Sequence, residues 1–92
     1  MTMQKILVRK ADIFAADMDG STVMMNMETG MYYNLGEVGS RIWELLEQPI
    51  QVADLIEALT GEFDVSFDQC AKDTLPFLQR LLENKLILEA GE

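Results

Sequence analysis

Two turn signals divide residues 12–35 into three short apolar stretches, and this pattern constrains the fold more than any other feature of the sequence. The first turn, "DMDG" at 17–20, follows "DIFAA", and the second, "ETG" at 28–30, joins "STVMMNM" to "GMYYNL". Asp supplies local hydrogen bonds in such turns, and Gly20 and Gly30 suit backbone positions with positive φ. Residues 12–35 therefore predict a three-stranded antiparallel meander.

The apolar residues of the meander predict which of its faces is buried. If Met27 faces Met31 across the second turn, the strand period of two gathers one strongly apolar set of side chains on a single face. That set is Val23, Met25, Met27, Met31, Tyr33 and Leu35. The other face would hold Met24, Asn26, Tyr32 and Asn34. We expect the rest of the chain to cover the first face.

The motif Asp17-x-Asp19-Gly20 also has two chemical interpretations, and both fail. It resembles the nucleophile loop of haloacid-dehalogenase-type phosphatases, but their doubly wound sheet needs more than 92 residues, and no crossover helix follows Asp17. It also resembles half of a calcium loop, whose twelfth position would be Glu28. Residues 22–27 predict a strand, however, where a calcium loop needs alternating oxygen ligands. The motif is therefore interpreted as a tight turn.

Two helices are predicted after the meander, over residues 37–48 and 51–61. Pro49 ends the first helix, and Gly61 suits the position just past the end of the second. The apolar face of the first helix holds Val38, Ile42, Leu45 and Leu46, with Trp43 beside them. The face of the second holds Val52, Leu55, Ile56 and Leu59. Both faces can pack against the apolar side of the meander.

A third, longer helix is predicted to begin after Ser66 and to reach about residue 85. Ser66 and Gln69 have the spacing of a capping box, and Pro76 should kink the helix because it removes one backbone donor. Its apolar face holds Phe67, Cys70, Ala71, Thr74, Leu78 and Leu81, flanked by Leu75 and Leu82 on one side and Phe77 on the other. The segment "LILEA", residues 86–90, is predicted to be a short extended segment.

These elements predict one α+β domain over residues 1–92, a winged helix-turn-helix-like arrangement with strands at about 12–35 and helices at about 37–85. Such domains commonly bind DNA, but the formal charge of this chain is −9. Residues 1–10 contribute +3 of this, so the remaining residues carry −12. A surface this acidic repels a phosphate backbone. A winged-helix DNA-binding regulator is therefore only an alternative hypothesis.

The composition argues against catalysis. There is no histidine, which excludes His-based catalysis and nearly all zinc sites. The single cysteine, Cys70, excludes an internal disulfide, fits a reducing cytoplasm and has no histidine to activate it as a nucleophile. Ser21, Ser40 and Ser66 lack the sequence setting of an acyl-carrier attachment site. No apolar run is long enough for a membrane span or a signal peptide. We expect a cytoplasmic protein that is not an enzyme and needs no cofactor or metal.

The stretches "MYYNLGEVGSRIWELLEQPIQVADLIEALTGEFDVS" and "DTLPFLQRLLENKLI" together resemble the PqqD-like family. Its members are small peptide-recognition domains of pathways that make ribosomally synthesised, post-translationally modified peptides. The residues that carry the resemblance, which covers about 12–88, are Tyr33, Leu35, Gly39, Ile42, Trp43, Asp73, Phe77, Leu78, Leu81, Leu86 and Ile87. The chain departs from the family pattern at Gly36, usually Asn, at Lys85, usually Gly, and at Pro76, which is unusual within this helix.

The resemblance implies a non-catalytic adaptor that binds the leader segment of a precursor peptide and presents it to a maturation enzyme. The leader would add as an antiparallel strand to residues 31–35, in the groove beside the third helix. The sequence itself suits this role, because residues 31–35 form an edge strand without the lysine or proline that blocks pairing. The predicted peptide-binding residues are Met31, Tyr32, Tyr33, Asn34, Leu35, Cys70, Asp73, Thr74, Phe77 and Leu81.

Some of these residues also have a purely structural interpretation. Phe77 and Cys70 could line the groove or complete the core, and Asp73 could pair with a basic leader residue or face solvent. Among subtypes, the "Y-x-L…G-x-x-IW" pattern is most similar to the stand-alone leader-binding proteins of lasso-peptide clusters. The partners would then be the precursor leader, a leader peptidase and, downstream, a macrolactam-forming synthetase. The alternative is the PQQ type, which serves a radical-SAM enzyme. Neither nucleic acid nor a membrane is an expected partner.

Overall fold

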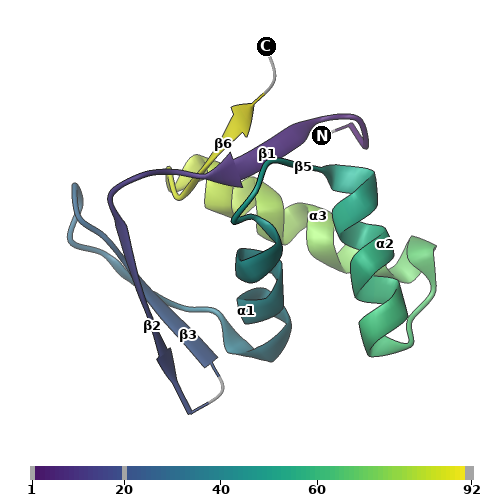
Figure 1. Cartoon of the computed structure of the whole chain (residues 1–92), viewed down its shortest axis with the longest axis horizontal. Coiled ribbons are helices and arrows are strands. Elements are labelled where there is room, and N and C mark those ends of the chain that lie inside the picture. The colour runs from purple at the N-terminus through teal and green to yellow at the C-terminus, as the bar shows by residue number, and fades with distance from the viewer. Residues whose placement is uncertain (1, 20, 91–92) are drawn as a thin grey trace.

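The fold is given by a computed structural model that describes residues 2–19 and 21–90. In chain order its elements are β1 (Ile6–Arg9), β2 (Ile13–Met18), β3 (Ser21–Asn26), β4 (Tyr32–Asn34), α1 (Gly36–Leu45), β5 (Ile50–Gln51), α2 (Val52–Phe63), α3 (Phe67–Glu83) and β6 (Ile87–Ala90) (Figure 1). The strands form two antiparallel sheets, ordered β2–β3–β4 and β5–β1–β6. The predicted α+β class, a three-stranded meander followed by three helices, is confirmed. The second sheet was not predicted.

The tight turn predicted at 17–20 is confirmed as the connection between β2 and β3. Met18 pairs with Ser21 across it, and Asp19 has a φ of 55°. Two-residue hairpin turns of the common type require positive φ, and Asp tolerates this conformation better than most residues. The positive φ predicted for Gly20 lies outside the described residues.

The second hairpin differs from the prediction by one residue in register. Met25 pairs with Tyr32 and Met24 with Tyr33, whereas the sequence analysis placed Met25 opposite Tyr33. The loop is longer than "ETG", because the pairing ends at Asn26, whose carbonyl accepts a hydrogen bond from the Gly30 N–H at 2.7 Å. Gly30 has the expected positive φ, 74°. A one-residue slip exchanges the faces of a strand, so the predicted inner and outer faces of β3 are reversed.

Met24 and Asn26 are therefore the buried residues of β3, with 0% and 1% of their surfaces exposed. Met27 and Met31, predicted to be buried, are more than half exposed. Asn26 is a polar anchor in this position: its amide nitrogen donates to the carbonyls of Asn84 at 3.4 Å and Lys85 at 3.5 Å, and its side-chain oxygen accepts from the Glu28 N–H at 2.9 Å. These bonds attach the tip of the hairpin to the C-terminal end of α3.

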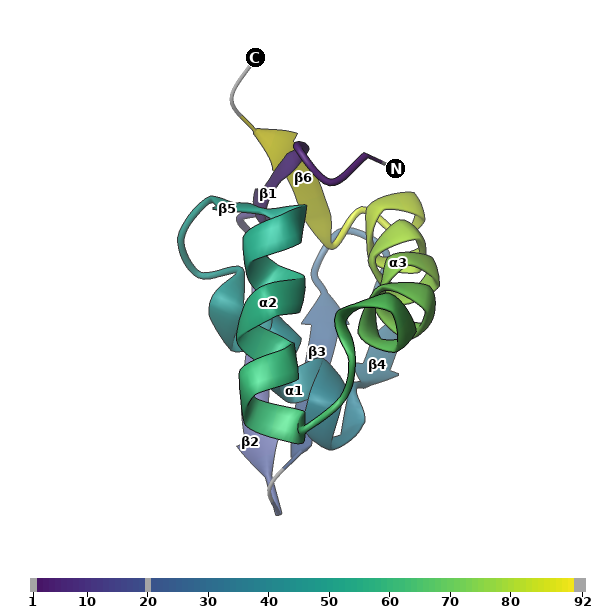
Figure 2. The same cartoon turned by 90° about the vertical axis from the view of Figure 1, so that its right-hand side faces the viewer.

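The helices cover the inner face of the meander. In Figure 2, α2 and α3 lie in front of the sheet β2–β3–β4, and α1 lies between the two layers. The apolar side chains buried in this core are Leu7, Met24, Ile42, Trp43, Leu46, Val52, Leu55, Ile56, Leu59, Cys70, Ala71, Leu78, Leu81, Leu86 and Ile87. The apolar face predicted for the second helix is confirmed at every position, and most of the other two faces is confirmed as well.

Four details of the helices were predicted wrongly. α1 ends at Leu45, three residues before the predicted end at Gln48, so Pro49 does not set its end. Val38 and Phe67, predicted to be buried, are 45% and 39% exposed, and each lies in the first turn of its helix. Gly61 does not end α2, which continues to Phe63 and closes at Asp64 with a φ of 52°. The predicted cap of α3 is confirmed, since the Ser66 hydroxyl accepts from the Gln69 N–H at 3.2 Å.

The second sheet joins the two ends of the described chain. β1 pairs with β6 over four residues, from Ile6 opposite Ala90 to Arg9 opposite Ile87. The extended segment predicted at 86–90 is thus confirmed as β6. No structure was predicted for β1, because four residues without an adjacent turn signal give little pattern to interpret. Burial of Leu7 in the core explains why this short strand forms.

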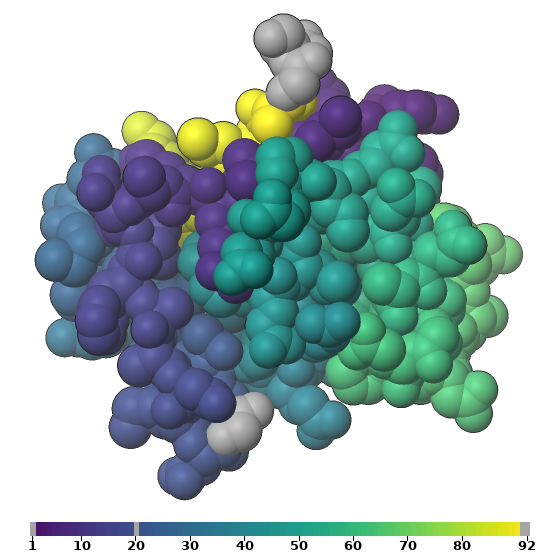
Figure 3. Space-filling model, viewed as in Figure 1, coloured from purple at the N-terminus to yellow at the C-terminus, as the bar shows by residue number. Residues whose placement is uncertain are grey.

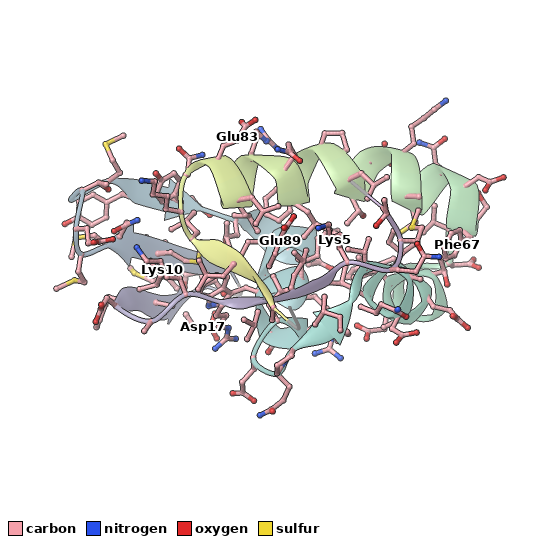
Figure 4. All side chains as sticks on the ribbon, turned by 90° about the horizontal axis from the view of Figure 1, so that it is seen from above. Lys5, Lys10, Asp17, Phe67, Glu83 and Glu89 are labelled. Carbon is pink, nitrogen blue, oxygen red and sulfur yellow. The ribbon has the colours of Figure 1, made fainter. Side chains whose placement is uncertain are left out.

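Charged side chains link elements at the surface. Lys5, just before β1, contacts Glu89 of β6 at 3.2 Å (Figure 4). Arg41 of α1 donates to both carboxylate oxygens of Glu62 of α2, at 2.8 and 3.0 Å. These hydrogen bonds lower the pKa of Glu62 and raise that of Arg41. The pair links α1 to α2 at the surface.

We predict that Asn26→Ala lowers the free energy of unfolding by about 1–3 kcal/mol, because the carbonyls at the end of α3 would lose their donor. Urea denaturation monitored by circular dichroism measures this change. The control is Gln79→Ala, which replaces an exposed residue of α3 and should change the free energy of unfolding by less than about 0.5 kcal/mol. Equal stability of the two variants would show that Asn26 does not anchor the hairpin.

Candidate functional site

The free edge of β4 is the first component of the candidate site. Within the described residues, β4 has a neighbouring strand on one side only, β3. The Leu35 N–H donates to Thr22 O at 2.9 Å, and the Met31 carbonyl accepts from the Asn26 N–H at 3.0 Å. Ladder bonds in an antiparallel pair recur at every second residue. The N–H and C=O groups of Tyr32 and Asn34 therefore point away from β3, toward the open edge.

A groove runs between this edge and α3. Its main part is a cavity of about 560 Å³. The residues that line it are Tyr32, Tyr33, Asn34, Leu35, Phe77, Arg80, Leu81, Asn84 and Leu86. One wall thus comes from β4, which offers main-chain hydrogen bonds, and the other from α3, which offers apolar side chains. An extended peptide needs both kinds of wall.

The groove continues past the start of α1. A second cavity, of about 210 Å³, shares Leu35, Phe77 and Arg80 with the first. It is further lined by Val38, Gly39, Ile42, Asp73 and Thr74. A third, of about 220 Å³, lies toward the α2–α3 connection and is lined by Val38, Leu59, Phe63, Val65, Cys70, Asp73 and Thr74. Shared lining residues make the three cavities one trough along α3.

Phe77 occupies the centre of this trough. Its ring lies against Gly39 of α1, so closely that a Cβ atom added at Gly39 would come within 3.2 Å of the ring and 3.0 Å of the Leu35 Cβ. Real Cβ atoms rarely approach another group this closely, so only glycine fits without a shift. Phe77 is half-buried and also lines the main cavity, so it belongs to the core and to the groove wall at once.

Two charged residues of α3 line the groove. Arg80 lies over the Phe77 ring, with its guanidinium carbon 5.7 Å from the ring centre, and lines the first two cavities. Asp73, seven residues earlier, accepts from the Gln69 side chain at 3.1 Å. Seven residues of helix span about 10 Å, the length of about three residues of extended peptide. None of the ion pairs among the described residues involves Arg80.

Most of the predicted peptide-binding residues come together in this trough. Tyr32, Tyr33, Asn34, Leu35, Phe77 and Leu81 line the main cavity, and Asp73 and Thr74 line the other two. Cys70 is 6% exposed and contributes only to the third cavity. Met31 is exposed and lines none of the three.

The groove residues that were not among those predicted are Val38, Gly39, Ile42, Leu59, Phe63, Val65, Arg80, Asn84 and Leu86. Arg80 had a usable signal, because it follows Phe77 by three residues and Asp73 by seven, and helical residues at this spacing share a face. Asn84 and Leu86 had no such signal in the sequence, since they lie in the turn between α3 and β6.

Comparison with known proteins gives a family that agrees with this geometry. The family model described as "Coenzyme PQQ synthesis protein D (PqqD)" matches residues 21–87. The chain belongs to the PqqD family. A comparison with curated proteins found no match.

Two solved structures are similar to this member of the PqqD family. "TbiB1 in Complex with the TbiA(beta) Leader Peptide" has a TM-score of 0.82 and 28% sequence identity, over 92% of this chain and 99% of that one. "Lasso peptide synthetase B1 complexed with the leader peptide" has a TM-score of 0.77 and 24% identity, over 89% of this chain and 96% of that one. The first supports kinship in sequence and fold, and the second supports the fold.

The described residues contain neither a membrane-spanning candidate nor a metal-binding cluster. None of the helices in residues 2–19 and 21–90 is long and apolar enough to cross a bilayer. In the same ranges, no three Cys, Asp or Glu side chains gather in a way that could hold a metal ion.

We predict opposite effects of the same substitution at two helical glycines. Gly39→Ala should lower the free energy of unfolding by about 1–3 kcal/mol, because its methyl group would press on Phe77 and Leu35. At Gly61 no atom lies within 4 Å of an added methyl group, so Gly61→Ala should stabilise α2 by about 0.5–1 kcal/mol. Chemical denaturation of both variants tests the pair. A stable Gly39→Ala protein would show that the contact with Phe77 is not tight.

Proposed function

We propose that this protein is a non-catalytic adaptor that binds the leader segment of a ribosomally synthesised precursor peptide and presents it to a maturation enzyme. The observation that carries the proposal is the β4 edge. The main-chain groups of Tyr32 and Asn34 point outward there, beside a groove whose other wall is apolar. The leader complex of TbiB1 supports it, because that protein shares nearly the whole fold.

The binding chemistry is strand addition. The leader lies antiparallel to β4 and pairs with the outward N–H and C=O groups, which gives affinity with little dependence on leader sequence. Selectivity comes from the leader side chains that point into the groove, because alternate residues of a strand face the same side. Phe77 and Leu81 receive apolar side chains, and Arg80 and Asp73 receive charged or polar ones.

The direction of the leader follows from the arrangement of the walls. Tyr32 lies near the end of the groove lined by Asn84, and Leu35 lies toward the end lined by Asp73. β4 and α3 thus run in opposite directions along the groove. A leader antiparallel to β4 runs in the direction of α3, with its earlier residues near Asp73 and its later residues near Arg80.

The maturation enzyme of this proposal is a leader peptidase of the lasso-peptide type. The first helix supports that assignment, since Gly39, Ile42 and Trp43 have the pattern of the stand-alone lasso leader-binding proteins. The PqqD family model supports the second candidate, a radical-SAM enzyme of the PQQ type. Both candidates use the same groove, so the leader experiments below apply to either.

The proposal predicts saturable binding of the precursor leader that is encoded with this protein. Fluorescence anisotropy of the labelled leader measures its Kd, and a labelled DNA duplex is the control. We expect micromolar or tighter binding of the leader and no response from the duplex, because the chain is strongly acidic. Salt-sensitive duplex binding without leader binding would instead favour the winged-helix regulator.

We predict that Asn34→Pro abolishes leader binding while Asn34→Ala preserves it. Both substitutions remove the side-chain oxygen that contacts Ser21 and Gly36, but only proline removes the outward N–H. The β3–β4 ladder survives in both, because its bonds come from Met31 and Leu35. Anisotropy titration gives the affinities, and circular dichroism checks the fold. Leader binding by a folded Asn34→Pro protein would refute strand addition.

We predict that Phe77→Ala weakens leader binding by about 1–3 kcal/mol, the cost of losing an interface anchor. Because Phe77 also packs on Gly39, the variant should be less stable, so binding is measured at a temperature where circular dichroism shows it folded. Phe67→Ala, an exposed aromatic on the same helix outside the groove, is the matched control. Equal affinities of the two folded variants would assign Phe77 to the core alone.

A further inference from the structure

The outer face of the sheet β2–β3–β4 is apolar, although no helix in the described part of the chain covers it (Figure 2). Across the three strands, Phe14 pairs with Met25, which pairs with Tyr32. The next outward row is Ala16, Val23 and Asn34, and beyond it Met18 pairs with Ser21. Residues directly opposite each other in antiparallel strands share a face. The side chains of these rows therefore form one surface, here called the outer sheet face.

Several of the exposed apolar side chains lie on this face. Phe14 is 60%, Met18 57% and Tyr32 71% exposed. They are three of the eight large apolar residues that are exposed in the described part of the chain. The space-filling view places β2 at the side of the molecule away from α2 and α3 (Figure 3). A contiguous exposed apolar patch on a small protein commonly marks an interaction site.

The charges around the outer sheet face select the kind of partner. Residues 12–35 contain four acidic residues, Asp12, Asp17, Asp19 and Glu28, and no lysine or arginine. Lys10, the nearest basic residue before this segment, is paired with Glu28, which lowers the pKa of Glu28. A partner that fits has an apolar centre and a rim of lysine and arginine. A second copy of this chain fits poorly, because it would bring the same acidic rim against this one.

The outer sheet face is also continuous with the leader site. Tyr32 belongs to both, since its main chain faces the open edge and its side chain ends the outward row that begins at Phe14. A leader added to β4 becomes a fourth strand. Alternate leader side chains would then extend the outer sheet face, while the others enter the groove.

We propose that the outer sheet face is the docking surface for the maturation enzyme, which contacts it with an apolar patch rimmed by basic residues. This inference rests on the proposed function and adds where the enzyme binds. The groove and the docking surface lie on opposite faces of the same strand. The enzyme therefore binds the leader-loaded adaptor more tightly than the free adaptor, because loading adds leader side chains to the surface it contacts.

The test separates leader binding from enzyme docking. Phe14 and Met18 lie on β2, which is three strand spacings, about 14 Å, from a leader added to β4. The double variant Phe14→Ser/Met18→Ser is compared with Leu88→Ser, which removes an exposed apolar side chain from β6. Labelled leader is first titrated with each protein, and the loaded complex is then titrated with the purified maturation enzyme encoded with the precursor.

We expect all three proteins to bind the leader with the same affinity. The double variant should bind the enzyme at least about tenfold more weakly than the wild type, and Leu88→Ser should match the wild type. Equal enzyme affinities of the double variant and the wild type overturn the docking proposal and leave the leader site intact. Failure of the wild type to bind the leader at all overturns the proposed function instead.

A charge variant tests the basic rim of the partner. Asp12 and Asp19 have φ values of 71° and 55°, which asparagine adopts as readily as aspartate, so Asp12→Asn/Asp19→Asn should keep the turns. This variant should bind the enzyme more weakly and with less dependence on salt. Tighter enzyme binding would overturn the proposed basic rim. Sedimentation showing a wild-type dimer that Phe14→Ser/Met18→Ser dissociates would assign the face to self-association and overturn the proposal.

Discussion

The register of the β3–β4 hairpin determines the surfaces of this protein. The Gly30 turn, closed on Asn26, sets which residues of β3 face the helices and which groups of β4 face the open edge. With this register, Met24 enters the core, and the main-chain groups of Tyr32 and Asn34 remain available to a partner. A slip of β3 by one residue would bury Met25 and expose Met24. The candidate groove and the outer sheet face both depend on it.

Much of the fold was predictable, because strong local signals specify it. The hairpin turns, the three helices and the Ser66 cap each depend on a few neighbouring residues. The register of the second hairpin was not predictable in the same way, because "NMETG" accommodates a three-residue or a four-residue loop equally well. Burial of Asn26 decides between them, and its partners at Asn84 and Lys85 are distant in sequence. β1 was missed for a similar reason, since its pairing partner is β6.

The candidate site, like the fold, was predictable where a few neighbouring residues specify it and not where distant residues do. The edge strand and the apolar side of α3 were predicted from residues 31–35 and from the helical spacing around Phe77. Arg80 was not among the predicted peptide-binding residues, because a single exposed arginine on an acidic helix is usually solvated. Its position over Phe77 becomes apparent only when β4 and α1 are placed beside the helix. Main-chain recognition leaves little trace in side-chain patterns, which is why the family resemblance was informative.

The pairing of β1 with β6 has a consequence for synthesis in the cell. Leu86, just before β6, lines the groove, and Leu86 and Ile87 are buried in the core. During translation, β1 can pair with β5 early, but its longer partner β6 emerges only when nearly all of the described chain has been made. The groove is incomplete on the nascent chain, because α3 and Leu86 are made after β4. The edge of β4 therefore exists before the helical wall that completes the groove.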